Sequence, residues 1–258
     1  MVPVAGISTH LLPATKSQPK EMLPVGRKPV VHYVAEELTA NGIEQILLVT
    51  GRDKSSIENH FDHDPELARA ITASSKESLL EEVEFESMRA RVFYTRQRAE
   101  KGLGGAILCA ENFACEEPFV VALGDSILGL HGQSRTLSLM WELFRAQQAS
   151  CVVAVEEVPP ERTSHHGIVK PAGGSGNWMR VLSLVEKPRP ADAPSNLAIA
   201  GRYILSPRIF DLIRRVAPDS HGQIQITDAI QLLCEEGKRV LAVRLPPHEK
   251  RYHVAAFP

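Results

Sequence analysis

The chain has 258 residues, of which 43% are hydrophobic and 23% charged, and its formal net charge is −2. This composition is typical of a globular protein, and the near-neutral charge gives no reason to expect a nucleic acid polymer as partner. No apolar run approaches the roughly 20 residues that cross a bilayer, and no signal-peptide pattern is present, so we expect no membrane association. The four cysteines lack metal-binding spacing, and free thiols favour the cytoplasm.

Strand and helix patterns alternate up to residue 157. Short apolar runs predict strands, and apolar residues at helical spacing predict the helices between them. The expected strands cover residues 2–5, 45–50, 91–94, 119–123 and 151–157. The expected helices cover residues 29–40, 55–61, 65–87, 103–111 and 136–149. This alternation favours parallel strands with right-handed crossovers and a ligand site at their carboxyl ends.

Beyond residue 157 the pattern changes, because strands follow one another without a helix after each. Residues 167–170, 179–186 and 197–205 are expected to be strands, and residues 171–177, which contain three glycines, a hairpin loop. The sequence therefore predicts an α/β protein with a doubly wound, mostly parallel, Rossmann-like sheet and a mixed or antiparallel C-terminal extension. We expect residues 1–258 to form a single domain.

The most informative segment covers residues 5–24 and reads Ala-Gly-Ile-Ser-Thr-His-Leu-Leu-Pro-Ala-Thr-Lys-Ser-Gln-Pro-Lys-Glu-Met-Leu-Pro. A loop of small residues directly after a strand can turn its backbone N–H groups toward a phosphate. Lys16 and Lys20 could add point charges there. Neither the GxGxxG pattern of dinucleotide-binding loops nor the GxxxxGK[ST] pattern of P-loops is present. On its residues alone, the segment is as compatible with an ordinary turn as with a phosphate loop.

This segment resembles the pattern GxGTRxLPxTKxxPKEMLP of the bacterial UTP–glucose-1-phosphate uridylyltransferases. It matches that pattern at Gly6, Thr9, residues 12–13, residues 15–16 and throughout residues 19–24. Further blocks similar to the same family follow in order at residues 57–62, 96–97, 101–104, 124–125, 185–188, 194–203 and 224–230. The resemblance covers essentially the whole chain. It implies a nucleotidyltransferase fold, with residues 1–150 as the nucleotide-binding half and residues 151–258 as the sugar-phosphate-binding half.

The resemblance also implies an activity and a set of site residues. Members of this family convert UTP and glucose 1-phosphate to UDP-glucose and pyrophosphate, by in-line attack of the sugar phosphate on the α-phosphorus of the nucleotide. By position, the implied catalytic residues are Lys20, Asp125 and His10, and Asp125 is also the implied ligand of Mg²⁺. The implied nucleotide-binding residues are Ala5, Gly6, Gln97 and Gly102, and the implied sugar-phosphate-binding residues are Glu186, Lys187 and Gly201.

The residues themselves leave structural alternatives open. Asp125 can be a turn or cap residue at a strand end, and Gln97 can be an ordinary surface residue. Glu186 and Lys187 can form a solvated charge pair. The dipeptide Thr227–Asp228 reads equally well as the N-cap of the helix that follows it, and we expect its main role to be structural.

Some positions depart from the family pattern where the chemistry needs charge. His10 stands in place of an arginine, and His253 in place of an aspartate that is the second Mg²⁺ ligand. Histidine is mostly neutral at pH 7 and is a poor ligand for Mg²⁺. Ser8, Gly105 and Gln223 replace a glycine, a histidine and a glutamate of the family.

The histidine at position 10 is similar to a change found in non-catalytic, regulatory relatives of the family. The alternative to an active enzyme is therefore a catalytically deficient homologue that binds UDP-sugar or regulates an active uridylyltransferase. Family members continue beyond the position of Pro258 into a helix that helps to build the oligomer. The expected assemblies are a homo-oligomer or a hetero-oligomer with an active homologue.

Overall fold

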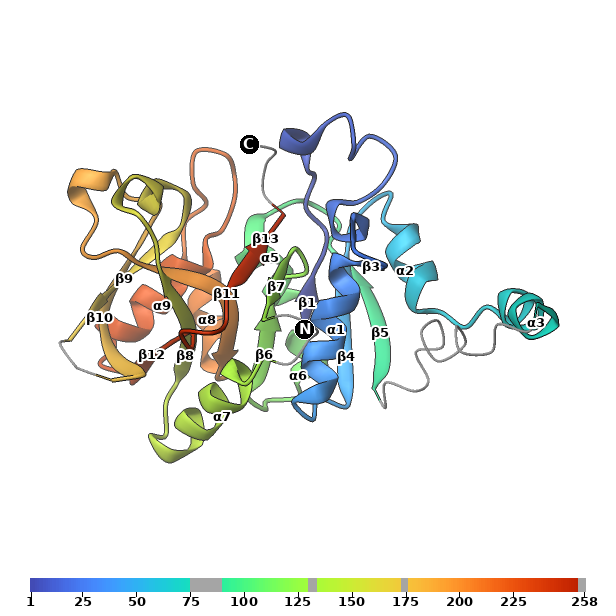
Figure 1. Ribbon diagram of the computed structural model, residues 1–258. Coiled ribbons are helices and arrows are strands. Elements are labelled where there is room, and N and C mark those ends of the chain that lie inside the picture. Colours follow the sequence, from blue (N-terminus) through green and yellow to red (C-terminus); the bar gives the residue numbers. More distant parts are fainter. Residues whose placement is uncertain (75–89, 130–133, 173–175, 255–258) are drawn as a thin grey trace.

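The computed structural model describes residues 1–74, 90–129, 134–172 and 176–254. A parallel sheet has the order β1–β4–β5 and contains β1 (Val2–Pro3), β4 (Gln45–Thr50) and β5 (Arg91–Arg96). Strand β6 (Phe119–Ala122) lies beside β1 in Figure 1. The amino group of Met1 donates to the carbonyl of Val120 at 2.8 Å, and the N–H of Ala122 donates to the carbonyl of Met1 at 3.1 Å. These bonds join the parallel sheet to a second sheet.

The second sheet is mixed and has the order β6–β11–β8–β12–β10–β9. Its remaining strands are β8 (Cys151–Glu157), β9 (Gly167–Pro171), β10 (Trp178–Glu186), β11 (Leu197–Leu205) and β12 (Val240–Arg244). Strand β12 pairs in parallel with β8, and the other pairings are antiparallel. The α/β class and the mixed extension are thereby confirmed. The unforeseen feature is the place of β11, which lies between β6 and β8 and runs antiparallel to both.

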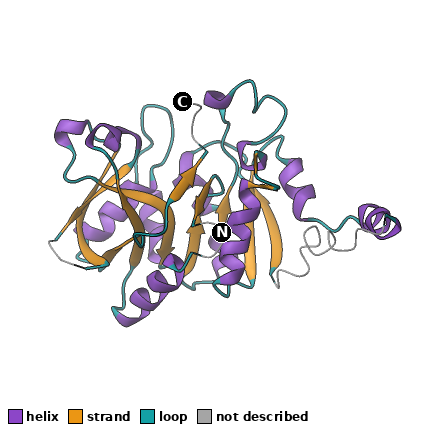
Figure 2. Cartoon of the chain, in the orientation of Figure 1, coloured by secondary structure: helices purple, strands orange, loops and turns teal. Residues whose placement is uncertain are grey.

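Helices cover the central part of the sheets on both faces (Figure 2). The helices α1 (Val30–Ala40) and α7 (Thr136–Ala146) pack on one face, and α5 (Gly102–Leu108), α8 (Arg208–Arg215) and α9 (Ile226–Glu235) pack on the other. Strand β8 supplies both cores, because Val152 and Ala154 join the α1 side while Val153 and Val155 join the α9 side. An apolar run such as residues 151–155 of β8 is expected where both faces of a strand are buried.

Several element boundaries differ from the sequence predictions. The helix expected at 103–111 is two helices, α5 and α6 (Glu111–Ala114), with a break at Cys109. The helix expected at 65–87 is described only as α3 (Pro65–Ala73), and its later part lies outside the described residues, as do residues 173–175 of the expected hairpin loop. The N-cap of α9 is Gln225, so the prediction of a cap at Thr227–Asp228 was wrong. Both residues lie in the first turn of the helix.

Short elements complete the carboxyl end of the parallel strands. The hairpin strands β2 (Pro24–Val25) and β3 (Lys28–Pro29) precede α1, and α2 (Ser55–Phe61) follows β4. Strand β13 (Arg251–His253) pairs antiparallel with β7 (Ser126–Leu128) and lies beside it in Figure 1. This pairing brings residues 251–253 to the residues that follow β6. None of the helices in the described ranges has the length and apolarity that a bilayer crossing requires.

Candidate active site

An ion pair between Lys20 and Asp125 lies at the carboxyl ends of the strands. Lys20 begins the 3₁₀ helix η2 (Lys20–Met22), and Asp125 lies just beyond β6. The Nζ of Lys20 donates to Oδ2 of Asp125, and the two side chains are only 16% and 13% exposed. The Nε2 of His253 lies 3.3 Å from the same carboxylate oxygen.

The charge state of Asp125 follows from these neighbours. Burial by itself raises the pKa of Asp125. The hydrogen bond from His253 and the positive charges of Lys20 and His253 together lower this pKa by more than burial raises it. The net result is a pKa well below the usual range of an aspartate. Asp125 is therefore a carboxylate at neutral pH.

Two cavities meet at this ion pair, because both Lys20 and Asp125 line each of them. The smaller cavity has a volume of about 240 Å³ and the larger of about 1040 Å³. The smaller one is lined by all four residues that the family resemblance assigned to the nucleotide, namely Ala5, Gly6, Gln97 and Gly102. The larger one is lined by His10 and Lys187. The structure thus brings eight of the ten predicted site residues around two adjacent cavities that share Lys20 and Asp125.

The wall of the smaller cavity depends on a glycine at position 102. Gly102 has φ +71°, and a Cβ there would lie 3.0 Å from both the Cβ of Gln223 and the carbonyl oxygen of Ile224. Two backbone hydrogen bonds of 2.9 Å tie Ile224 to Lys101 and Gly104. The Nε2 of Gln97 donates to the carbonyl of Gly102 at 3.3 Å. Any larger residue at position 102 would be strained and would displace this wall.

The larger cavity is lined by more cationic than acidic side chains. Burial lowers the pKa of His10, and the positive charges of Lys20 and His253 lower it further, while Asp125 opposes them. His10 is therefore neutral at pH 7, unlike an arginine. Arg162 and Lys187 also line this cavity. An anionic ligand would meet permanent charge from these two residues and from Lys20.

Most of the chain matches one known protein family. Residues 1–247 match the family model described as nucleotidyl transferase. The chain belongs to the nucleotidyl transferase family. Over 255 residues it is 44% identical to the UTP–glucose-1-phosphate uridylyltransferase of Bacillus subtilis (strain 168), a match that covers 98% of this chain and 85% of the relative.

Solved structures resemble this nucleotidyl transferase closely. The crystal structure of an apo UDP-glucose pyrophosphorylase superposes with a TM-score of 0.90 at 38% identity, over 99% of this chain and 92% of that one. A UDP-glucose pyrophosphorylase complexed with UDP-glucose superposes with a TM-score of 0.86 at 38% identity, over 97% and 90% of the two chains. These matches confirm the family resemblance and the Rossmann-like nucleotidyltransferase fold.

Two predicted residues of this nucleotidyl transferase, Glu186 and Gly201, line neither of these two cavities. The Oε2 of Glu186 accepts a hydrogen bond of 2.6 Å from the hydroxyl of Thr227, and its Oε1 lies 3.8 Å from the Nζ of Lys187. Gly201 has φ +79°, and a Cβ there would lie 3.2 Å from the side chain of Leu123. The structure therefore gives Thr227 a role in orienting Glu186 that its position in the sequence did not suggest.

Sequence reasoning missed an ion pair that anchors Lys20. Glu21 and Lys54, only 2% and 7% exposed, form a contact of 3.1 Å between the start of α2 and η2. Burial raises the pKa of Glu21, and the charge of Lys54 opposes this. Because Glu21 follows Lys20 directly, the pair fixes the backbone of η2. The only sequence signal was the place of Glu21 inside the Pro-Lys-Glu-Met-Leu-Pro block.

The residues available for a metal ion are few. Within the described ranges, no group of three or more His, Cys, Asp or Glu side chains has the arrangement of a metal site. Among these residues, Asp125 is the one carboxylate that lines both cavities. Mg²⁺ is commonly held by one or two carboxylates together with substrate phosphates. The donor set therefore fits an ion that binds together with a nucleotide, with Asp125 as its protein ligand.

Proposed function

We propose that this nucleotidyl transferase forms UDP-glucose and pyrophosphate from UTP and glucose 1-phosphate. The observation that carries the proposal is the meeting of the two cavities at Lys20 and Asp125. A nucleotide in the smaller cavity and a sugar phosphate in the larger one would face each other across this ion pair. The names of the similar proteins, which include UTP, glucose 1-phosphate and UDP-glucose, support the same pair of substrates.

In this proposal the smaller cavity binds UTP. The side-chain amide of Gln97 offers both a donor and an acceptor, which suits the edge of uracil. Gly102 allows the base to approach the backbone closely, as Ala5 and Gly6 do for the rest of the nucleotide. The proposed base contacts thus come from residues after β5, and the others from residues after β1.

The larger cavity binds glucose 1-phosphate. Lys187, which lines this cavity, holds the phosphate. Glu186 and Gly201 line neither cavity, so their proposed contacts with the sugar hydroxyls require the sugar to extend beyond the cavity lining. A phosphate oxygen of glucose 1-phosphate then forms a bond to the α-phosphorus of UTP as the bond to the bridging oxygen breaks and pyrophosphate leaves. Lys20 neutralises charge at the reacting centre, with His10 beside it.

Asp125 is the proposed ligand of Mg²⁺. When bound, the ion would neutralise part of the triphosphate charge. The depressed pKa of Asp125 keeps the carboxylate ionised and ready for this role. His253 contributes no negative charge, so nucleotide phosphates and water molecules would supply the other ligands.

The residues at positions 10 and 253 favour a second function, in which the chain does not catalyse the reaction itself. His10 lacks a permanent charge, and His253 contacts Asp125 where the family pattern has a second carboxylate. Both features weaken the binding of a triphosphate. They therefore support a catalytically deficient homologue that binds UDP-sugar or regulates an active partner. The four cysteines are free, which supports the cytoplasm as the proposed compartment for either function.

One experiment separates the two functions. Pyrophosphate release from UTP and glucose 1-phosphate is measured with Mg²⁺ on purified protein, beside calorimetric titrations of UTP and UDP-glucose. Turnover of roughly 1–10³ s⁻¹ supports the enzyme. Binding without turnover supports the regulatory homologue, and the absence of both refutes the proposal.

A further inference from the structure

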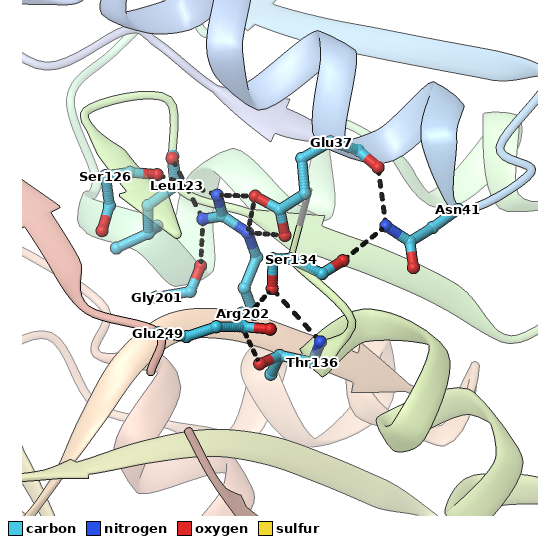
Figure 3. A network of polar contacts seen from close by, with 9 residues as sticks. All are labelled: Glu37, Asn41, Leu123, Ser126, Ser134, Thr136, Gly201, Arg202 and Glu249. Atoms are coloured by element: carbon cyan, nitrogen blue, oxygen red, sulfur yellow. Dashed lines mark hydrogen bonds and ion pairs between the residues drawn. The ribbon is translucent and has the colours of Figure 1, made fainter. Parts of the chain in front are cut away.

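A buried ion pair connects α1 to β11 below the active site. The guanidinium of Arg202 and the carboxylate of Glu37 are 0% and 1% exposed. The Nη2 and Nε of Arg202 donate to the two oxygens of Glu37 at 2.6 and 3.0 Å, which makes the pair bidentate (Figure 3). No sequence pattern pointed to this pair.

The same guanidinium contacts the loop that carries Asp125. Its Nη2 donates to the carbonyl of Ser126 at 2.8 Å, and its Nη1 lies 3.4 Å from the carbonyl of Leu123. These two carbonyls bracket Asp125 on either side. Figure 3 shows the guanidinium between Glu37 and this loop. One side chain therefore fixes the backbone both before and after the carboxylate.

A contribution to the stability of the fold does not by itself explain why a buried ion pair stands at this place. Removing two charges from water is costly, and replacing a buried ion pair with apolar residues of similar volume is often neutral or stabilising. Arg202, however, satisfies three backbone carbonyls as well as Glu37, including its neighbour Gly201 at 3.2 Å. An arginine presents five N–H donors in a fixed planar fork, whereas a lysine has three donors on a single nitrogen and an apolar side chain has none.

We infer that Arg202, held in place by Glu37, is a positioning residue that sets the backbone of residues 123–126 and thereby the place of Asp125. On the side away from Arg202, the same loop is held by the pairing of β13 with β7, which begins at Ser126. The N–H of Val254 also donates to the carbonyl of Asp125 at 3.0 Å. On the side that faces β11, the loop is held by Arg202 and by the hydrogen bond of 2.9 Å from the N–H of Leu123 to the carbonyl of Gly201. The effect on catalysis rests on the proposed function, whereas the effect on the loop does not.

The test uses variants that remain folded. Arg202→Met alone leaves Glu37 buried and unpaired, so the double variant Glu37→Met with Arg202→Met is made, together with Arg202→Lys. The lysine keeps the ion pair but loses the fork. If the role were charge pairing alone, Arg202→Lys would behave as the wild type.

The first readout needs neither substrate nor metal. Amide hydrogen exchange is followed by mass spectrometry in the free protein. In both variants we expect the amides of Leu123 and Ser126, which donate to the carbonyls of Gly201 and Leu123, to exchange at least about tenfold faster than in the wild type. Unchanged protection of these amides in the double variant would overturn the inference.

Glu249→Gln is the matched control. Glu249 is a buried carboxylate close by, but it accepts hydrogen bonds from the hydroxyls of Ser134 and Thr136 (Figure 3) and from the backbone N–H of Arg135, all at the start of α7. We expect it to loosen the start of α7 and to leave residues 123–126 protected. Equal loosening of residues 123–126 in this control would show a general loss of stability and would also overturn the inference.

The second readout is the calorimetric affinity for UTP with and without Mg²⁺. In the double variant we expect the gain that Mg²⁺ provides to fall by about tenfold or more, while the affinity for UTP alone changes less than about twofold. An unchanged gain would contradict a role in placing Asp125. If the wild type binds no UTP, the proposed function fails, and the exchange experiment still decides the role of Arg202.

Discussion

Lys20 and Asp125 are 105 residues apart in the chain, and their ion pair forms the boundary between the two cavities of the site. Lys20 comes from the loop after β1, and Asp125 comes from the loop after β6. Each residue therefore faces both proposed substrates. A substitution at either position should affect the reaction itself more than the binding of one substrate.

Lys20→Met removes the cation at this boundary. We expect kcat to fall by about 10²-fold or more, because the charge that develops on the phosphates loses a fixed partner. Pyrophosphate release at saturating UTP and glucose 1-phosphate measures the loss. Lys16→Met, on the same loop but lining neither cavity, is the control and should stay within about twofold of the wild type. Similar losses in both variants would contradict a special role for Lys20.

The double change His10→Arg with His253→Asp restores the charges that the family pattern has at these positions. We expect Mg²⁺-dependent turnover to rise by about an order of magnitude or more, because a permanent cation and a second carboxylate both strengthen the hold on the triphosphate. The measurement is pyrophosphate release across a Mg²⁺ titration. If the rate does not change, these two positions do not limit the chemistry.

Gly102→Ala should damage the nucleotide cavity. A positive φ costs a residue with a side chain about 1–3 kcal/mol, and the new methyl group would press on Gln223 and Ile224. We expect the affinity for UTP to fall roughly 10- to 100-fold in a calorimetric titration. Gly42→Ala is the matched control, because Gly42 has φ +81° and nothing within 4 Å of an added Cβ. It should lose stability alone, and a loss of UTP affinity there would contradict the argument.

The stability of the protein should fall as the pH drops below about 6.5. Burial and the charge of His32 lower the pKa of His60 to about 4, from a usual value of 6.5. Between these two pH values the unfolded chain binds a proton at His60 that the folded chain does not, so acid favours unfolding. After allowance for solvent screening we expect about 1–2 kcal/mol of this loss at pH 5.

Urea unfolding at pH 7 and pH 5 measures this effect. His60→Gln should show a smaller difference between the two pH values than the wild type does. His221→Gln, which changes an exposed histidine, is the control and should keep the difference seen in the wild type. A variant at position 60 that loses as much stability as the wild type would refute the assignment.

The sequence predicted the strands that are mostly apolar. Residues 45–50, 151–157 and 197–205 match β4, β8 and β11, because burial on both faces leaves long apolar runs, which in β11 are interrupted by Gly201 and Arg202. The order of the strands was not predictable in the same way. Periodicity shows which faces of a strand are buried but not which strand lies beside it, so the place of β11 between β6 and β8 came only from the structure.

The site was predictable to a similar degree. The glycine loop and the lysines were visible in the sequence, while the resemblance supplied the assignments of residues such as Gln97 and Asp125. Arg202 lies inside an apolar strand, and Glu37 lies on a helix 165 residues away. Their pairing depends on tertiary packing, which no local pattern records. The same is true of Glu21 and Lys54.

The insertion of β11 between β6 and β8 also bears on the order of events during synthesis. Both backbone edges of β8 are paired with later segments, β11 on one side and β12 on the other. A nascent chain that has emerged only as far as residue 196 therefore presents β8 as an apolar strand with unpaired edges. Such strands are prone to aggregate, and pairings distant in sequence form slowly. Delaying translation just before β11 should prolong this exposure and lower the yield of native protein, whereas a delay after β12 should have little effect.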